Sequence, residues 1–343
     1  MRWDGQSIKA DRDDTLPGLT QLSGLVRTVR TPEFSGITFH EVLAKSALNR
    51  VPEASRMLAG EWTINPFRGC THACRYCFAR STHRYLDLNT GEDFDSQIVV
   101  KTNVVQLLTK ELHTKRPPRV ALGTNTDPYQ RAEGKYRFMP GIIEALGERA
   151  VPFSILTKGT LLRRDLDQLA EVSAVTDVSL AMSIGIFDEE LQESIEPGTA
   201  TTAARLATVR AIRERGLKCT VLLAPILPFF TDSDEQLDHA VAELKAAGAT
   251  QIFFTALYLR DGVKDWFMSW LARTYPERLP AYDDLYGAGA YTPLGYQDDL
   301  RLRMRALLAR HGFHRGGTEG FARSRRRQAT AVQPAPAPQP ALF

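Results

Sequence analysis

The sequence predicts a mixed α/β fold built on a parallel sheet. Six short segments rich in β-branched residues recur between residues 62 and 256, and amphipathic segments of helical period lie between them. Because parallel strands need long crossovers, which are usually helices, this alternation predicts successive βα units. Right-handed crossovers repeated in one direction curl such a sheet towards a barrel, which six units would leave open on one side. The alternation alone also fits a doubly wound sheet.

The expected elements follow one another in regular order. The strands are expected at residues 62–66, 119–123, 153–157, 178–183, 219–224 and 252–256. The helices between them are expected at residues 104–112, 142–149, 166–172, 203–215 and 235–247. Pro197 and Gly198 interrupt the chain before the fourth helix, and Gly216 and Gly248 follow the fourth and fifth, where glycine commonly ends a helix.

The two ends of the chain differ from this core. Residues 1–60 are polar and interrupted by proline and glycine, with one helical segment expected near residues 40–48, and we expect them to wrap around the core. The core barrel itself is expected over residues 61–257. Residues 316–343 combine a basic cluster with Pro-Ala repeats, which cannot bury apolar surface and therefore predict a disordered tail.

A helical cap is expected over residues 258–315. Two segments of helical period lie in it, at residues 265–275 and 297–311. Three large apolar residues fall on one face of the first segment: Trp266, Trp270 and Leu271. We therefore expect this segment to pack on the barrel as a lid or as a bottom cap.

Composition limits the classes of protein to consider. A chain of 343 residues with 43% hydrophobic content can bury one sizeable core. The net charge of +3 is too small to imply a polyanionic partner, and no apolar run approaches the length of a membrane span. Four cysteines, three of them in one motif, are no disulfide framework, and with no signal peptide they indicate the reducing cytoplasm.

The most informative motif is a cysteine triplet. Cys70, Cys74 and Cys77 are spaced C-x3-C-x2-C, so three thiolates could hold three irons of a [4Fe–4S] cubane and leave the fourth without a protein ligand. An open coordination position suits chemistry rather than structure. The alternatives are a zinc knuckle that lacks one ligand, or three unrelated thiols. Zinc sites usually show paired halves, and His72 and His83 have no such partners.

The surroundings of the triplet suit a cluster. Gly69 gives the backbone room, and Arg68, Arg75 and Arg80 should favour the thiolate form. Each arginine could equally be a solvated surface charge, and for Arg75 this is the expectation. Cys219, by contrast, lies in an apolar strand and is expected to be structural core.

Polar residues also follow the later strands, at the ends where barrel enzymes gather their chemistry. The segment at residues 123–130 follows the second strand, and Thr157, Lys158 and Gly159 follow the third. Ser183 ends the fourth strand and Ala224 the fifth. For Asp127, a turn cap before Pro128 and a role with substrate are both open.

With Tyr76 directly before its third cysteine, the triplet resembles the motif of the radical S-adenosylmethionine (SAM) superfamily. The flanking words Asn-Pro-Phe-Arg-Gly-Cys, Gly-Thr-Asn-Thr-Asp-Pro-Tyr-Gln, Leu-Thr-Lys-Gly and Ile-Glu-Pro-Gly resemble its spore photoproduct lyase-like branch, over roughly residues 25–312. The resemblance implies a partial (β/α)6 TIM barrel that binds a [4Fe–4S] cluster and SAM. It also implies reductive cleavage of SAM to a 5′-deoxyadenosyl radical that abstracts hydrogen from an unidentified substrate, and a small reductant protein of the flavodoxin or ferredoxin type.

The resemblance also implies roles for single residues. Cys70, Cys74 and Cys77 would ligate the cluster, and Lys158 would bind the SAM carboxylate. The other SAM contacts would be Thr124, Asn125 and Thr126 at the amino group, Ser183 at the ribose, backbone around Ala224 at the adenine edge, and Tyr76 and Phe78 beside the adenine. Glu196 and Arg205 would contact SAM or pair with each other.

One departure separates the chain from spore photoproduct lyase, which uses a cysteine near its second-strand loop to return a hydrogen atom. Residues 121–130 contain no cysteine here. Either another donor such as Tyr129 serves, or the reaction is not thymine-dimer repair, and we favour the second. The rival functions are repair of DNA photolesions, with nucleic acid as partner, and a non-enzymatic iron–sulfur electron carrier.

Overall fold

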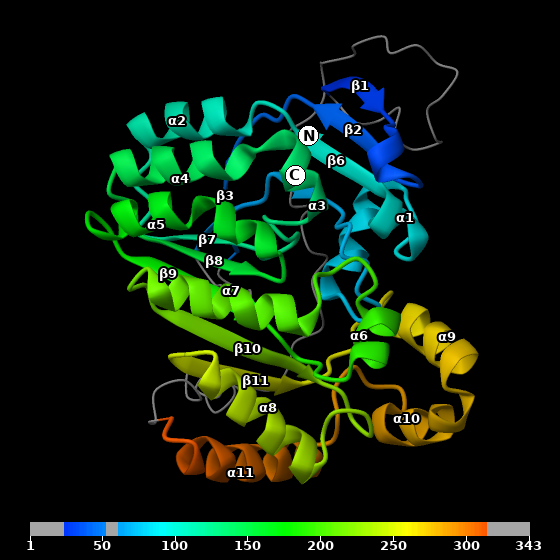
Figure 1. The fold of residues 1–343 in the computed structure, drawn as a ribbon. Helices are drawn as coiled ribbons and strands as arrows, with labels where there is room; N and C mark the ends of the chain where they lie inside the picture. The colour runs from blue at the N-terminus through cyan, green and yellow to red at the C-terminus, as the bar shows by residue number, and fades with distance from the viewer. Residues whose placement is uncertain (1–23, 53–60, 314–343) are drawn as a thin grey trace, which may run out of the picture.

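The computed structural model describes residues 24–52 and 61–313, and its centre is a seven-stranded sheet (Figure 1). The strand order is β11-β10-β9-β8-β7-β4-β3. The strands are β3 (Leu48–Arg50), β4 (Trp62–Ile64), β7 (Val120–Leu122), β8 (Phe153–Thr157), β9 (Val178–Ser183), β10 (Cys219–Ile226) and β11 (Gln251–Ala256). The strands from β4 to β11 pair in parallel, and β3 adds an antiparallel edge. The six predicted strands and the partial barrel are confirmed.

Helices cover the outer face of this sheet, on the side away from the barrel interior (Figure 1). They are α2 (Val104–Thr114), α4 (Phe138–Glu148), α5 (Leu166–Ser173), α7 (Thr202–Glu214) and α8 (Asp234–Ala246). Each corresponds to a predicted helix. Gly216 and Gly248 have φ angles of 75° and 89°, the left-handed conformation expected just after α7 and α8.

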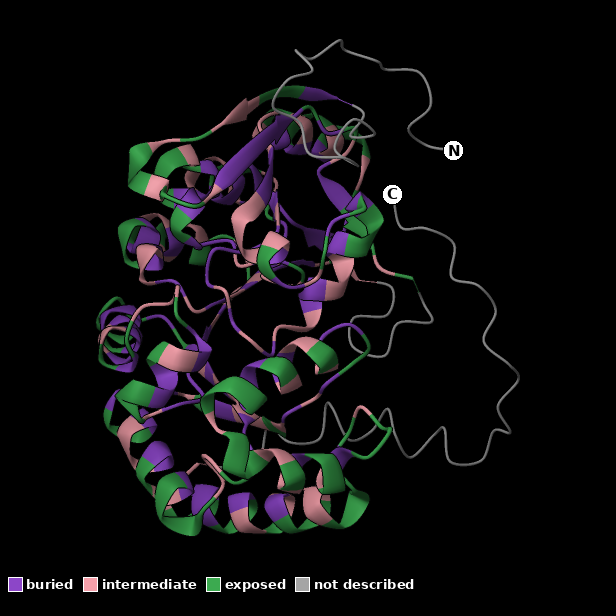
Figure 2. Cartoon of the chain, turned by 90° about the vertical axis from the view of Figure 1, so that its right-hand side faces the viewer, coloured by how far each residue is buried: buried purple, intermediate pink, exposed green. Residues whose placement is uncertain are grey.

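One apolar core joins the sheet to its helices. Ile155 of β8 and Val221 of β10 belong to the same buried cluster as Val209 of α7. Phe39 and Met304, from the two ends of the described chain, belong to it as well. Figure 2 shows the resulting division, with exposed residues on the solvent side of the outer helices and buried residues on the side that faces the sheet.

A second, four-stranded sheet lies beside the barrel and was not predicted. Its order is β1-β2-β6-β5, formed by β1 (Leu25–Val29), β2 (Thr38–Val42), β6 (Gln97–Lys101) and β5 (Phe67–Arg68). The predicted helix at residues 40–48 is therefore wrong. Every residue of β2 is buried, because β2 pairs with β1 on one side and with β6 on the other. These tertiary partners outweigh the helical preference of the segment.

The remaining elements of the described residues are helices. The α-helices are α1 (Glu92–Ser96), α3 (Arg131–Tyr136), α6 (Glu189–Ile195), α9 (Lys264–Thr274), α10 (Leu279–Tyr286) and α11 (Leu294–Arg310). The 3-10 helices are η3 (Pro32–Phe34), η4 (Phe78–Leu86), η5 (Thr160–Asp165) and η6 (Pro276–Arg278). The two predicted C-terminal helices are confirmed as α9 and α11, whereas α10 was not predicted.

Helices α9 and α10 form a lid beyond the C-terminal ends of β10 and β11 (Figure 1). Trp270 and Leu271 of α9 pack with Tyr282 of α10 in a buried cluster that also contains Cys74 and Tyr76. Of the two placements predicted for this segment, lid or bottom cap, α9 therefore has the lid placement. Helix α11 packs instead against α8 on the outer layer (Figure 1).

Some expectations lie beyond these observations. The tail at residues 316–343 and residues 1–23 of the N-terminal extension lie outside the described residues. The division of the chain at residues 60, 257 and 315 stays a prediction. Within residues 24–52 and 61–313, no helix combines the length and the apolar character needed to cross a membrane.

Candidate active site

The cysteine loop runs from β5 to η4 and is folded tightly against the second sheet. Cys70 and Cys74 are buried and Cys77 is half-buried. Gly69 has a φ of 82°, and a Cβ there would lie 2.9 Å from the carbonyl oxygen of Phe94. The Cys70 N–H donates to that same oxygen at 3.0 Å. The close approach explains the glycine before the first cysteine.

Burial raises the pKa of all three thiols. At Cys77 the Arg80 guanidinium acts in the opposite direction, as expected, but burial outweighs it and the pKa stays raised. The expected influence of a neighbouring arginine is therefore present at Cys77, but it is too small to make the thiolate the favoured form in the protein by itself. A bound metal deprotonates a coordinating thiol outright, so thiolate formation here would accompany metal binding.

The three thiols lie near one another without converging on the position of a single metal ion. Among the described residues, no three His, Cys, Asp or Glu side chains are grouped closely enough to hold one metal ion. A cubane places each thiolate on a different iron, so its ligands need not converge on one point. Cys77 packs against the buried cluster that contains Cys74 and against the one that contains Cys70, so the three thiols lie in one small region. All three thiols are free of disulfides.

The buried side chain of Arg80 holds the cysteine loop in place. Its side chain is fully buried, and its Nε donates to the Cys74 carbonyl oxygen at 2.9 Å while one terminal nitrogen lies 2.8 Å from Asp95. Trp266 of α9 stacks over its guanidinium at 5.1 Å and over that of Arg75 at 5.6 Å. Arg75 is therefore half-buried under the lid, and the expectation of a solvated surface charge is wrong.

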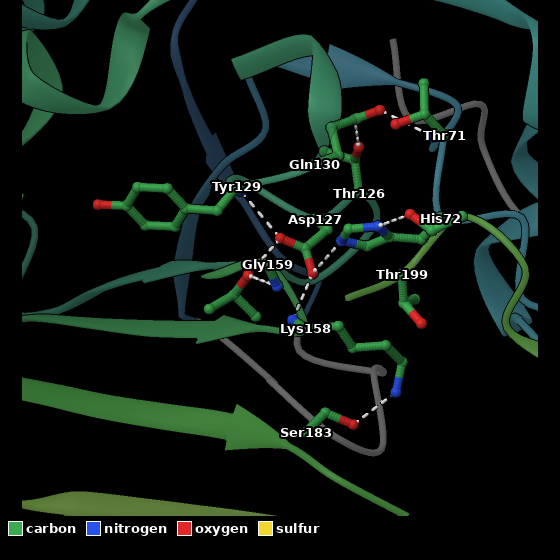
Figure 3. Close-up of polar contacts among 12 residues, drawn as sticks. Thr71, His72, Thr126, Asp127, Tyr129, Gln130, Lys158, Gly159, Ser183 and Thr199 are labelled. Atoms are coloured by element: carbon green, nitrogen blue, oxygen red, sulfur yellow. Dashed lines mark hydrogen bonds and ion pairs between the residues drawn. The ribbon is translucent and has the colours of Figure 1, made fainter. Parts of the chain in front are cut away.

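Lys158, directly after β8, meets the end of β9 and the α6–α7 loop. Its Nζ donates to Ser183 Oγ at 2.6 Å (Figure 3) and lies 3.2 Å from Glu196 Oε1. The ammonium also stands 5.6 Å over the ring of Tyr76, whose hydroxyl donates to Glu196. Three predicted site residues, Tyr76, Lys158 and Ser183, are thus brought together around a buried carboxylate.

Glu196 is held as a carboxylate between two cations. Arg205 pairs with it at 2.8 Å, and both side chains are 0% exposed. Burial alone would raise the pKa of Glu196, but the charges of Arg205 and Lys158 outweigh it and lower that pKa to about 2. Of the two roles left open for Glu196 and Arg205, the structure contains the mutual pair. Lys158 and Arg205 together exceed the charge of Glu196 by one, so the network suits a further anion.

The loop after β7 holds the predicted amino-group contacts. Thr124 Oγ1 donates to the side chain of Asn65 at 3.2 Å, and the side chain of Asn125 is exposed. Thr126 is buried and its hydroxyl donates to the carbonyl oxygen of Gly69 at 2.8 Å. Thr126 therefore supports the cysteine loop, a contact the sequence did not reveal.

The remaining predicted contacts lie on either side of the loop. Ser183 Oγ donates to the Ala224 carbonyl oxygen at 3.3 Å, which joins the ends of β9 and β10. Phe78 packs beside Cys70 and Phe94, whereas Tyr76 belongs to the lid cluster. Their shared contact with adenine stays a prediction.

The carboxylate of Asp127 caps the turn that contains it and also accepts hydrogen bonds from residues outside that turn. Its carboxylate accepts from the Tyr129 N–H at 2.8 Å, the Thr157 hydroxyl at 2.5 Å and the Lys158 N–H at 2.7 Å, which favours the turn-cap reading (Figure 3). The ring of Tyr129 points away from Lys158, and its hydroxyl donates to Asp165 at 3.0 Å. Tyr129 is therefore badly placed to return hydrogen at the cysteine loop. His72, which also contacts Asp127, was missed because its spacing matches no ligand motif.

Comparison with known proteins identifies the family. The model of the Radical SAM superfamily matches residues 64–255. An uncharacterised protein of Mycobacterium tuberculosis is 53% identical over 324 residues, covering 92% of this chain and 95% of that protein. An uncharacterised protein of Methanocaldococcus jannaschii is 27% identical over 243 residues, covering 71% and 86%.

Among solved structures, the fold is similar to a variant of spore photoproduct lyase with bound AdoMet and dinucleoside spore photoproduct. The TM-score is 0.58 at 18% sequence identity, covering 82% of this chain and 81% of that one. At this identity the likeness concerns the fold. The family match spans more than half of the chain. The chain belongs to the Radical SAM superfamily, whose enzymes use a [4Fe–4S] cluster and SAM.

Proposed function

We propose that this enzyme cleaves SAM reductively at a [4Fe–4S] cluster held by Cys70, Cys74 and Cys77. In the family, the reduced cluster and SAM together supply a 5′-deoxyadenosyl radical that abstracts hydrogen from a substrate. The observation that carries the proposal is the meeting of the cysteine loop with a buried, net-positive network at the strand ends. Tyr76, in the cysteine loop, lies under the Lys158 ammonium at 5.6 Å and donates its hydroxyl to Glu196, so the two parts are close neighbours.

The residues of this network would bind and orient SAM. Lys158 would hold its carboxylate, because Glu196 carries one negative charge and pairs with both Arg205 and Lys158, so the two cations can take a second anion. Ser183 would meet the ribose, and backbone around Ala224 the adenine edge.

Contacts to the rest of SAM would come from the loops on either side. Thr124, Asn125 and Thr126 would face the amino group, with Thr126 acting partly through the loop that it supports. Tyr76 and Phe78 would flank the adenine. The lid helices over Cys74 and Tyr76 would limit the entry of water.

The test is anaerobic reconstitution with iron and sulfide. We expect absorption near the violet edge of the visible spectrum, and release of 5′-deoxyadenosine when dithionite and SAM are added. Cys74→Ala should lose both signals, whereas the control Cys219→Ala should keep both, because Cys219 is buried in β10 outside the loop. A wild-type protein with full iron content that releases no 5′-deoxyadenosine would contradict the proposal.

Repair of a DNA photolesion is the second candidate, favoured by the fold likeness to a lyase with bound dinucleoside spore photoproduct. Against it, residues 121–130 lack cysteine and Cys219 is fully buried. Repair predicts affinity for damaged duplex DNA that falls steeply with salt, because phosphate contacts release counterions. Equal, weak affinity for damaged and undamaged duplexes would exclude this candidate.

The proposal also covers the electron donor, the cellular compartment and the division of the chain. A small flavodoxin- or ferredoxin-type protein would supply the electron, and the cytoplasm would keep the thiols reduced. Residues 61–257 would form the catalytic core and residues 258–315 its cap. A mere electron carrier would need no SAM site, so SAM binding that is lost in Lys158→Ala would speak against that rival.

A further inference from the structure

His72, in the middle of the cysteine loop, bridges two other loops of the site. The side chain is buried, and its two ring nitrogens face different oxygens. Nε2 lies 3.2 Å from Asp127 Oδ2, in the loop after β7 (Figure 3). Nδ1 lies 3.1 Å from the carbonyl oxygen of Gly198, between α6 and α7. One ring therefore joins the cysteine loop to two loops that are distant in sequence.

The first bridge leads to Lys158. The Asp127 carboxylate that faces His72 also accepts the Lys158 N–H at 2.7 Å and the Thr157 hydroxyl at 2.5 Å. The backbone of Lys158 is thus two contacts away from the centre of the cysteine loop. The Nζ of the same lysine is directed at Ser183, as Figure 3 shows.

The second bridge leads to Glu196. The N–H of Gly198 donates back to the His72 carbonyl oxygen at 3.1 Å, so the contact between the two segments is mutual. A Cβ on Gly198 would lie 1.9 Å from the Thr71 carbonyl oxygen, so only glycine permits this approach. The neighbouring Thr199 donates its hydroxyl to the Glu196 carbonyl oxygen at 2.8 Å. Both ends of the His72 ring therefore reach the network around Lys158.

The contacts of His72 and Asp127 are strengthened by burial. The side chains of His72 and Asp127 are 5% and 10% exposed, so water competes little for their polar atoms. The cysteine loop has no helix or strand from residue 69 to residue 77, so single backbone hydrogen bonds and side-chain contacts hold it in place. In metal sites, groups behind the ligands commonly fix ligand orientation.

We propose that His72 and Asp127 form a positioning pair, which sets the cysteine loop at the correct distance from Lys158 for SAM to be held between them. The inference rests on the proposed function. Neither residue would touch the reacting atoms. Their effect would be on SAM binding and on the environment of the cluster rather than on the presence of the cluster.

The experiment compares His72→Phe and Asp127→Asn with the wild-type protein after reconstitution. His72→Phe keeps a ring of similar volume and removes both nitrogen contacts, whereas Asp127→Asn keeps the size of the side chain. Tyr129→Phe is the matched control, because it removes a buried hydrogen bond of the same loop that faces away from the site. The measurements are iron and sulfide content, electron paramagnetic resonance of the reduced cluster with and without SAM, and SAM affinity by equilibrium dialysis.

We expect both variants to keep wild-type iron content and a wild-type resonance without SAM. Their SAM affinity should fall about tenfold or more, and the change of the resonance on adding SAM should be altered. Tyr129→Phe should match the wild type in both respects.

Two results would overturn the positioning role. The first is wild-type affinity and a wild-type SAM response in His72→Phe. The second is loss of iron in His72→Phe and Asp127→Asn, which would make the pair a determinant of cluster assembly. If the wild-type protein itself shows no response to SAM, the proposed function fails instead, so the two failures are distinguishable.

Discussion

Two kinds of ion pair in this molecule have similar lengths and very different surroundings. Glu196 and Arg205 lie 2.8 Å apart at the mouth of the barrel, and both are 0% exposed. Arg215 and Asp167 lie 2.7 Å apart on the outer helices and are 44% and 79% exposed. Distance alone does not separate the two pairs, but burial does. Exposed pairs contribute little to stability, whereas a buried charge that loses its partner is costly.

The comparison indicates why the buried charges are retained. An apolar replacement of a buried ion pair is often as stable as the pair, so stability alone does not explain Glu196 and Arg205. Their arrangement holds Lys158 beside Ser183 and leaves it able to receive an anion. The outer pairs hold no such group, and the following predictions test this difference.

The largest effect is expected from Glu196→Ala. This change leaves Arg205 buried without a carboxylate, and we expect it to lower the free energy of unfolding by about 3–5 kcal/mol. Urea denaturation of the protein without its cluster measures the loss. The double variant Glu196→Leu/Arg205→Met, which removes both charges, should lose less. A single-variant loss as small as that of an outer pair would erase the distinction between the two regions.

Lys158→Met should mainly affect binding. Removing the ammonium deletes a charge-assisted contact, and we expect SAM affinity to fall about 10- to 100-fold. Lys245→Met on α8, whose ammonium lies over Phe313, is the matched control and should leave affinity unchanged. Equilibrium dialysis with the reconstituted proteins makes the measurement. If Lys158→Met binds SAM as tightly as Lys245→Met does, Lys158 is not part of the SAM site.

The buried carboxylate should also appear in the pH dependence of stability. The pKa of Glu196 is about 2 in the folded protein, against 4.5 ordinarily. Above pH 4.5 the group is ionised in both states and its stabilising contribution is complete; as the pH falls towards 2, the unfolded chain binds the proton first and the contribution is lost. Glu196→Gln lacks this loss, so the stability difference from wild type should be constant near pH 6 and should shrink below about pH 4.5 by up to about 1.4 kcal/mol per pH unit. Urea titrations that give a constant difference would refute the depressed pKa.

The smallest effect is expected from Arg215→Ala on the outer layer. Solvent already screens its pair with Asp167, so the melting temperature should stay within about 2 °C of wild type. Differential scanning calorimetry makes the comparison. A larger fall would show that outer pairs also carry stability, and would weaken the contrast with the barrel mouth.

The parallel sheet could be predicted because its pattern is local. Each strand from β7 to β11 is a short apolar segment followed by a helix, so both parts of the pattern are close together in the sequence. The second sheet could not be predicted in this way. Strand β2 is buried on both faces and shows no alternation, and its partner β6 begins at Gln97, far along the chain.

The candidate site divides in the same manner. The cysteine triplet, Lys158 and Ser183 were predicted because residue type and position at a strand end are visible locally. The contact between His72 and Gly198 joins residues 126 positions apart, and no local sequence pattern predicts it. Thr126 was predicted near SAM, but its bond to Gly69 depends on how two loops fold together.

The order of residues alone was enough to predict the family and the fold class, because thiol spacing and helical or strand period depend on neighbours along the chain. The tertiary structure decided which charged side chains are buried and which partners they have, as with Glu196 between Arg205 and Lys158. The physical reason is that the cost of removing a charge from water depends on everything that surrounds it, and most of those surroundings come from distant parts of the chain.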